Sequence, residues 1–350
     1  MTAQLKRAPY LFPLAVAAGI ATLLMAMPMP GLAEDEVNLY SSRQENLIKP
    51  LLDRFTEQTG IKVNLVTGKD DALLQRLQSE GRNSPADLLL TADAGRLHRA
   101  KAAGSTQAVS SEVLSEAIPA AYRDPEGHWY GLTLRARPIL YAKGKFDPAS
   151  LSTYEALAEP AFKGEICIRS SDNIYNQSLV ASMIAANGVE ATETWAKGLV
   201  ANLARPPKGG DRDQVKAAAA GECDIAVANT YYLAGMLTSK DGAERAAGEA
   251  MGVFWPNQDG RGAHVNVSGA AVTASARNRD SAIRLIEFLA SPESQQWYAD
   301  VNGEYPVREG VEMSPLLASW GTFKADSLNL ERLGELNAEA VRLMDRAGWK

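Results

Sequence analysis

Three tyrosines follow segments that resemble short buried strands. Of the residues in this sequence, their phenol groups are the strongest candidates for binding a ligand. Tyr231 and Tyr232 stand side by side after the apolar run DIAVA, and Tyr175 follows the strand candidate EICIRS. Neighbouring side chains of a strand point to opposite faces, so the simplest interpretation of the pair is one core tyrosine and one rim tyrosine. At the end of a strand, both could instead reach into a cleft.

An ionised phenol is a hard anionic donor that suits ferric iron. A free phenol loses its proton at about pH 10, but an adjacent, highly charged cation favours the phenolate. Three phenolates would offset the charge of Fe³⁺ and leave a neutral buried centre. Zinc prefers Cys, His or carboxylate ligands, and we expect structural roles for the three histidines, His98, His128 and His264.

Arginines near the same predicted strand ends could bind an anion beside such a metal. Arg43 follows the first predicted strand, and Arg135 and Arg137 lie in RARP, which joins two apolar strand candidates. An arginine there is either an exposed charge at a crossover or an anion ligand through its forked N–H donors. A small anion such as carbonate could fill positions that three tyrosines leave open, assisted by Asn173 and the backbone N–H groups that open the helix 174–187.

Motifs of catalysis are not found in the sequence. It contains no GxSxG, no P-loop and no GxGxxG after a strand candidate. Cys167 and Cys223 lack the CxxC spacing of a metal site, and either a disulfide or two buried thiols is compatible with their positions. We therefore expect a binding protein and not an enzyme.

The elements that must position these residues alternate between strand and helix. From Val37, strands are predicted at VNLY, IKVNLV and PADLLLTADAG, with helices at ENLIKPLLDRFTEQTG, DALLQRLQSEG and GRLHRAKAAG. GEICIRS and CDIAVAN begin a second series, with further helices over 195–203 and 211–220. Such alternation implies parallel sheets, whose ligands lie beyond the carboxyl ends of the strands.

A late strand, HVNVSGAAVTASA, and the helix SAIRLIEFLASPESQQWYA fit back on the first series. The prediction is an α/β fold of two discontinuous lobes, each a mostly parallel sheet flanked by helices. We expect the N-terminal lobe over 34–136 plus 262–310 and the C-terminal lobe over 137–261 plus 311–350.

The first 33 residues have the composition of a secretion signal. Lys6 and Arg7 precede an apolar stretch and the small residues before Glu34. A retained membrane anchor is the alternative, but the apolar run is near the lower limit for a span. Loss of the two basic residues would move the formal net charge from −6 to −8. Such acidity argues against nucleic acid as a partner and suits a freely diffusing periplasmic protein.

Several of these segments together are similar to periplasmic ferric-iron-binding proteins of bacterial iron ABC transporters. The likeness covers nearly all of residues 37–310 and includes YSSR, IYNQSL and NTYY at the predicted strand ends. It implies a type II periplasmic-binding fold with ferric iron in the cleft between the lobes. The paired tyrosines of the family match Tyr231 and Tyr232, and an additional tyrosine of some members matches Tyr175.

Two departures from the family pattern narrow the implied ligand set. Some members carry a histidine after the first strand, where this chain has Gln44-Glu45, and others a glutamate where this chain has Ala92 followed by Asp93. The resemblance therefore implies three tyrosines with a synergistic anion such as carbonate, and it places Arg43 and Arg137 near that anion.

The resemblance also implies a role in transport. A monomer would close on Fe³⁺ and dock on an inner-membrane ABC permease with its ATPase. The alternative function is binding of a small organic cation, such as a polyamine or thiamine-like compound, in an aromatic box. That function would require carboxylates at the strand ends, for which Asp93 and Asp172 are available. Whether Tyr40 or Gln44 contacts the metal is left open by the sequence.

Overall fold

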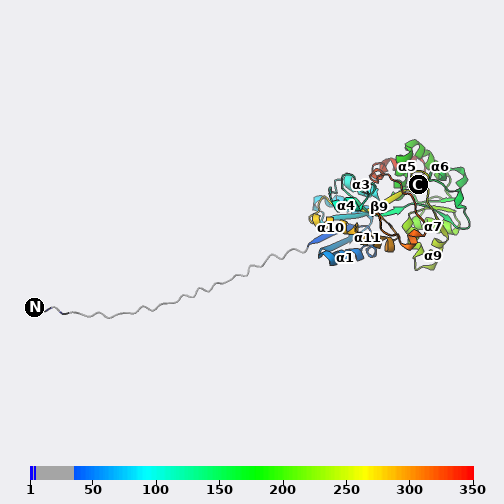
Figure 1. Ribbon diagram of the computed structural model, residues 1–350. Coiled ribbons are helices and arrows are strands. Elements are labelled where there is room, and N and C mark those ends of the chain that lie inside the picture. The colour runs from blue at the N-terminus through cyan, green and yellow to red at the C-terminus, as the bar shows by residue number, and fades with distance from the viewer. Residues whose placement is uncertain (3, 5–34) are drawn as a thin grey trace. The chain divides into compact units, whose positions relative to one another are not determined.

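Two mixed sheets organise the chain in the computed structural model, which describes residues 1, 2, 4 and 35–350 (Figure 1). The predicted secretion signal, apart from residues 1, 2 and 4, lies outside the described residues. The first sheet has the order β10 (Tyr305–Pro306), β4 (Tyr130–Ala136), β9 (Val265–Val272), β3 (Leu88–Ala92), β1 (Glu36–Ser41) and β2 (Lys62–Thr67). The second has the order β6 (Ile166–Cys167), β7 (Ile225–Val227), β5 (Ile139–Ala142) and β8 (Met251–Phe254).

Helices cover both sheets, as the alternating pattern predicts. Those around the first sheet are α1 (Lys49–Thr59), α2 (Asp70–Glu80), α3 (Ala94–Ala102), α4 (Glu112–Ala117), α10 (Arg279–Leu289) and α11 (Pro292–Trp297). Those around the second are α5 (Ile174–Asn187), α6 (Val189–Ala201), α7 (Asp211–Ala220), α8 (Thr230–Leu237) and α9 (Gly242–Glu249). Near the C-terminus follow α12 (Pro315–Ala318), α13 (Glu331–Glu335) and α14 (Asn337–Arg346).

The sheets are mixed, so the prediction of mostly parallel sheets was wrong in this respect. β1 pairs in parallel with β2 and β3, whereas β9 is antiparallel to both β3 and β4. The chain leaves the first sheet after Ala136 and returns at Val265. β9 therefore enters from the side facing the second sheet and runs opposite to β3 and β4. For the same reason β5 is antiparallel to β7.

Buried apolar side chains join these layers into a core. Leu39 of β1, Leu88 of β3 and Val267 of β9 are fully buried, as are Leu51 and Phe55 on the inner face of α1.

The predicted helix over 281–299 is instead two helices, because Pro292 lacks the N–H that a continuous helix needs there and begins α11. In the part of the chain described, no helix combines the length and apolar character required to cross a membrane.

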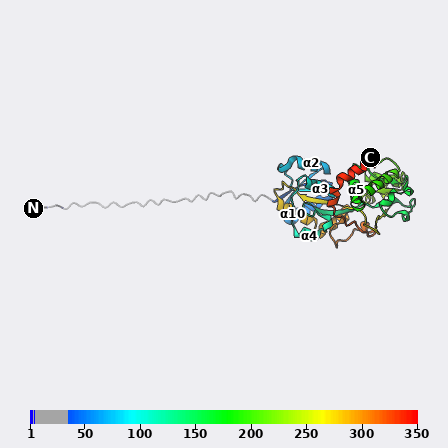
Figure 2. The ribbon, with the colours of Figure 1, turned by 90° about the horizontal axis from the view of Figure 1, so that it is seen from above.

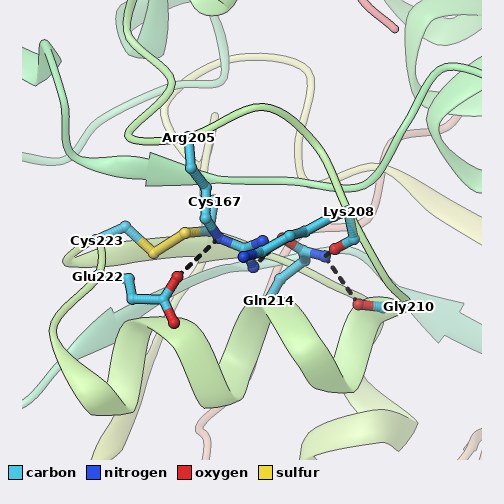
Figure 3. The surroundings of a disulfide bond; sticks show 7 residues. All are labelled: Cys167, Arg205, Lys208, Gly210, Gln214, Glu222 and Cys223. Atoms are coloured by element: carbon cyan, nitrogen blue, oxygen red, sulfur yellow. Dashed lines mark hydrogen bonds and ion pairs between the residues drawn. A yellow bond between two sulfur atoms is a disulfide. The ribbon is translucent and has the colours of Figure 1, made fainter.

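Two further features bear on how the layers are held. A disulfide joins Cys167 of β6 to Cys223 beside β7, with Cα atoms 6.0 Å apart. Figure 3 shows it above the helix α7, next to the Arg205–Glu222 ion pair of 3.3 Å.

In the C-terminal segment, α13 packs against both α3 and α5, and α14 lies along α5 (Figure 2). The segment after residue 311 therefore contacts helices of both sheets, and the predicted lobe boundaries stay a prediction.

Candidate functional site

A cavity of about 580 Å³ lies where the strand ends of the first sheet face helices that follow strands of the second. From the first side it is lined by, among others, Arg43, Gln44, Arg135, Ser268 and Glu304. From the second side come Tyr175, Arg212, Tyr231, Tyr232, Gly235 and Thr238. The three tyrosines singled out in the sequence therefore share one cavity.

Each tyrosine lies in the first turn of a helix that follows a strand. Asn173 caps α5 by accepting a hydrogen bond from the Tyr175 N–H at 3.1 Å. Asn229 occupies the corresponding position before α8, which carries Tyr231 and Tyr232. Successive helical residues are about 100° apart, in contrast to the opposite faces of a strand, so two neighbours can border one cavity. The Tyr231 and Tyr232 ring centroids are 4.3 Å apart.

Burial raises the pKa values of the paired phenols. The pKa of Tyr231 is raised well above its usual value, first by burial and then by the neighbouring Tyr175 and Tyr232. Burial, followed by Tyr175 and Asp211, raises the pKa of Tyr232 to about 12. A cation that binds these oxygens must displace their protons, and a more highly charged cation does so more readily.

The opposite wall includes Arg43, Arg135 and the carboxylate of Glu304. Arg135, from β4, places its Cζ 5.1 Å from the centroid of the Tyr231 ring, a cation–π geometry that spans the cavity. Arg43, which follows β1, forms a 2.7 Å ion pair with Glu304 and donates a 2.9 Å hydrogen bond to Thr133 Oγ1. Burial opposes ionisation of Glu304, but Arg43 and Arg135 outweigh it and lower the pKa of this carboxyl.

Arg137 lies outside this cavity, contrary to what an anion ligand would require. Its guanidinium, 1% exposed, donates to Asn176 at 2.6 Å, to Asn229 at 2.9 Å and to Asp211 at 3.0 Å. These partners stand at the N-terminal ends of α5, α8 and α7. Arg137 thus holds together the helix ends that present Tyr175, Tyr231 and Tyr232 and acts as a positioning residue. Asn173 is a helix cap and does not line the cavity either.

Of the four other residues considered from the sequence, only Gln44 lines the cavity. Tyr40 is buried and donates to Glu80 at 2.9 Å, away from the cavity, whereas Gln44 lines it. Asp93 is fully buried and accepts hydrogen bonds from Ser178 and Asn266, so it offers no carboxylate to an organic cation. Asp172 is not among the lining residues.

Comparison with known proteins shows to which family the chain belongs. Residues 51–325 match the family of bacterial extracellular solute-binding proteins. The chain belongs to this family. It is 52% identical, over 91% of its length and 88% of that protein's, to Iron uptake protein A1 of Synechocystis sp.. The prediction of a binding protein and not an enzyme is thereby confirmed.

Solved structures of similar chains have the same fold. The structure of Trichodesmium IdiA (FutA) in complex with iron and citrate ligands has 52% sequence identity and a TM-score of 0.88, covering 90% of this chain and all of that one. The ferric binding protein from Campylobacter jejuni has 43% identity and a TM-score of 0.85, covering 90% of this chain and all of that one. The type II periplasmic-binding fold and the resemblance to ferric-iron-binding proteins are therefore confirmed.

Sequence reasoning did not identify Glu304 as a residue of this solute-binding protein's cavity, and it assigned the wrong arginine of RARP to the cavity. Glu304 stands alone before a two-residue strand, and no motif marks it. The sequence makes both Arg135 and Arg137 anion candidates, and the family resemblance favours Arg137, whereas the structure places Arg135 in the cavity. The signal that separates them is their place relative to the crossover: Arg135 still belongs to β4 in the first sheet, whereas Arg137 lies beyond the strand.

Proposed function

We propose that this solute-binding protein captures ferric iron in the cavity and delivers it to an inner-membrane ABC permease with its ATPase. The observation that carries the proposal is the convergence of three phenol groups, from the first turns of α5 and α8, on one cavity. Relatives named for iron uptake and ferric binding, at 52% and 43% identity, support the choice of metal.

Tyr175, Tyr231 and Tyr232 are the proposed iron ligands. As phenolates they offset the three positive charges of Fe³⁺, and the helix N-termini that carry them favour the anionic form of their side chains. An anion such as carbonate would complete the coordination. Arg43 and Arg135 line the cavity and are the residues placed to hold that anion, which leaves Arg137 and Asn173 to position the helices.

Capture is proposed to work by closure of two lobes, 34–136 plus 262–310 and 137–261 plus 311–350. The tyrosines belong to the second lobe, and Arg43 and Arg135 to the first. A ligand that contacts both lobes shifts the equilibrium toward the closed form by its differential affinity for that form. The protein would act as a periplasmic monomer after removal of residues 1–33, and the closed form would dock on the permease.

The test is whether ferric iron develops a visible tyrosinate-to-iron charge-transfer band with the purified mature protein. Wild type should turn coloured with one iron per chain, and Tyr231→Phe and Tyr232→Phe should weaken both the band and the affinity. Tyr305→Phe is a matched control, because that phenol is buried, has no hydrogen-bond partner among the residues that the structure describes, and is not one of the cavity's lining residues. A colourless wild-type protein, or coloured and tight Tyr231→Phe and Tyr232→Phe variants, would overturn the proposal.

A further inference from the structure

Glu304 places a carboxylate inside the wall that the arginines form. It is 4% exposed, and its two oxygens are divided between Arg43 Nη2 at 2.7 Å and Arg135 Nη2 at 3.1 Å. Arg135 also donates to Ser268, and the Arg43 guanidinium lies 5.1 Å from the centroid of the buried Tyr298 ring. The arrangement is therefore a built ion cluster and not a mobile surface pair.

The other charged groups that line the cavity are engaged elsewhere. The charge of Asp70 is balanced by the Arg96 guanidinium at 3.6 Å, and its carboxylate also accepts hydrogen bonds from Thr91 at 2.6 Å and from the Ala92 N–H at 3.0 Å. Arg212 is 49% exposed and faces Glu244 at 3.5 Å. Of the residues that line the cavity, the buried ones thus carry two positive charges and one negative charge.

We propose that Glu304 sets the charge of the anion that binds beside the iron, so that the site prefers a monoanion and takes carbonate in its singly charged hydrogencarbonate form. This inference rests on the proposed function. Fe³⁺ with three phenolates is neutral, and Arg43, Arg135 and Glu304 together leave one positive charge. Uncompensated charge is costly in a buried site, so one added negative charge fits and two leave an excess. Without Glu304, the same wall would carry two positive charges and match a dianion.

The experiment compares anions of fixed charge on the iron-loaded protein. Acetate is the monoanion and sulfate the dianion at pH 7, and each is titrated while the charge-transfer band is followed. Wild type should bind acetate more tightly than sulfate. Glu304→Gln should reverse this order, with sulfate affinity rising roughly tenfold or more, as expected when a charge a few ångströms away is removed.

Three variants separate the charge of Glu304 from its shape. Glu304→Asp keeps the charge and should keep the wild-type order, and Glu309→Gln makes the same charge change at an exposed position and should have no effect. The double variant Arg43→Gln/Glu304→Gln restores the single positive charge and should again favour acetate.

Two outcomes would overturn the inference: a wild type that prefers sulfate, or a Glu304→Gln protein with the wild-type order. The first needs no variant, so it decides even if Glu304→Gln does not fold. Failure of the proposed function is distinguishable, because the wild-type protein would then show no charge-transfer band at all.

Discussion

Replacing one of the paired tyrosines should change the number of protons released when iron binds. With a pKa of about 12, Tyr232 is ionised in about one molecule in 10⁵ at pH 7. Tyr231 is raised in the same direction by burial and by its neighbouring phenols. If both oxygens bind Fe³⁺ as phenolates, each gives up one proton. The apparent iron affinity should then rise with pH by about tenfold per unit for each of the two residues, and fall correspondingly toward acid.

The assay is a proton-release titration of weakly buffered, iron-free protein with a fixed ferric donor between pH 6 and pH 8. Hydrolysis of the donor itself also releases protons, so the quantity of interest is the difference between proteins at equal bound iron. Tyr231→Phe and Tyr232→Phe should each release one proton fewer than wild type, and Tyr305→Phe should match wild type. Equal release by wild type and by both ligand variants, with iron bound, would refute the assignment of phenolate ligands.

Three further predictions concern stability. Replacing Cys167 and Cys223 with alanine removes a bond that spans 56 positions, and denaturant unfolding should show a loss of about 4 kcal/mol; a loss below about 1 kcal/mol would contradict this. Arg137→Met leaves a buried carboxylate short of one partner and should destabilise even the iron-free protein by about 3–5 kcal/mol, whereas a pure anion ligand would leave its unfolding unchanged. The Glu331 carboxylate raises the pKa of His98, so this pair stabilises the fold below the unfolded histidine pKa and loses that effect as pH rises through the folded value. The variant His98→Gln should therefore lower the free energy of unfolding more at pH 5.5 than at pH 8.5, with a difference of about 1 kcal/mol or less. An equal loss of stability at both pH values would contradict the ionic pairing.

Periodicity and end signals predict most of the elements, because they depend on local residues. Gly60, with a φ of 75°, ends α1 where the sequence predicts the end, and the helix predicted over 211–220 has those bounds. The direction of β9 could not be predicted in the same way. Whether a late strand pairs in parallel depends on the side from which the chain re-enters the sheet, and this is set by a crossover and not by the strand's own residues.

The tyrosines show what the sequence reveals about a site and where it stops. The order of strand, loop and helix predicted that Tyr175, Tyr231 and Tyr232 would gather at one edge, because strand ends converge there. It did not predict that the pair would occupy a helical turn. Choosing between Arg135 and Arg137 required the crossover point to within one residue. Glu304 becomes recognisable only once the fold brings it to Arg43, which follows β1, and to Arg135 of β4.

A crystal structure of the iron-loaded protein with anomalous scattering measured at the iron edge tests the central claim most directly. The account predicts a single strong peak in the cavity, in coordination contact with the phenol oxygens of Tyr175, Tyr231 and Tyr232. A peak bound elsewhere, or one that contacts fewer than these three oxygens, would contradict it.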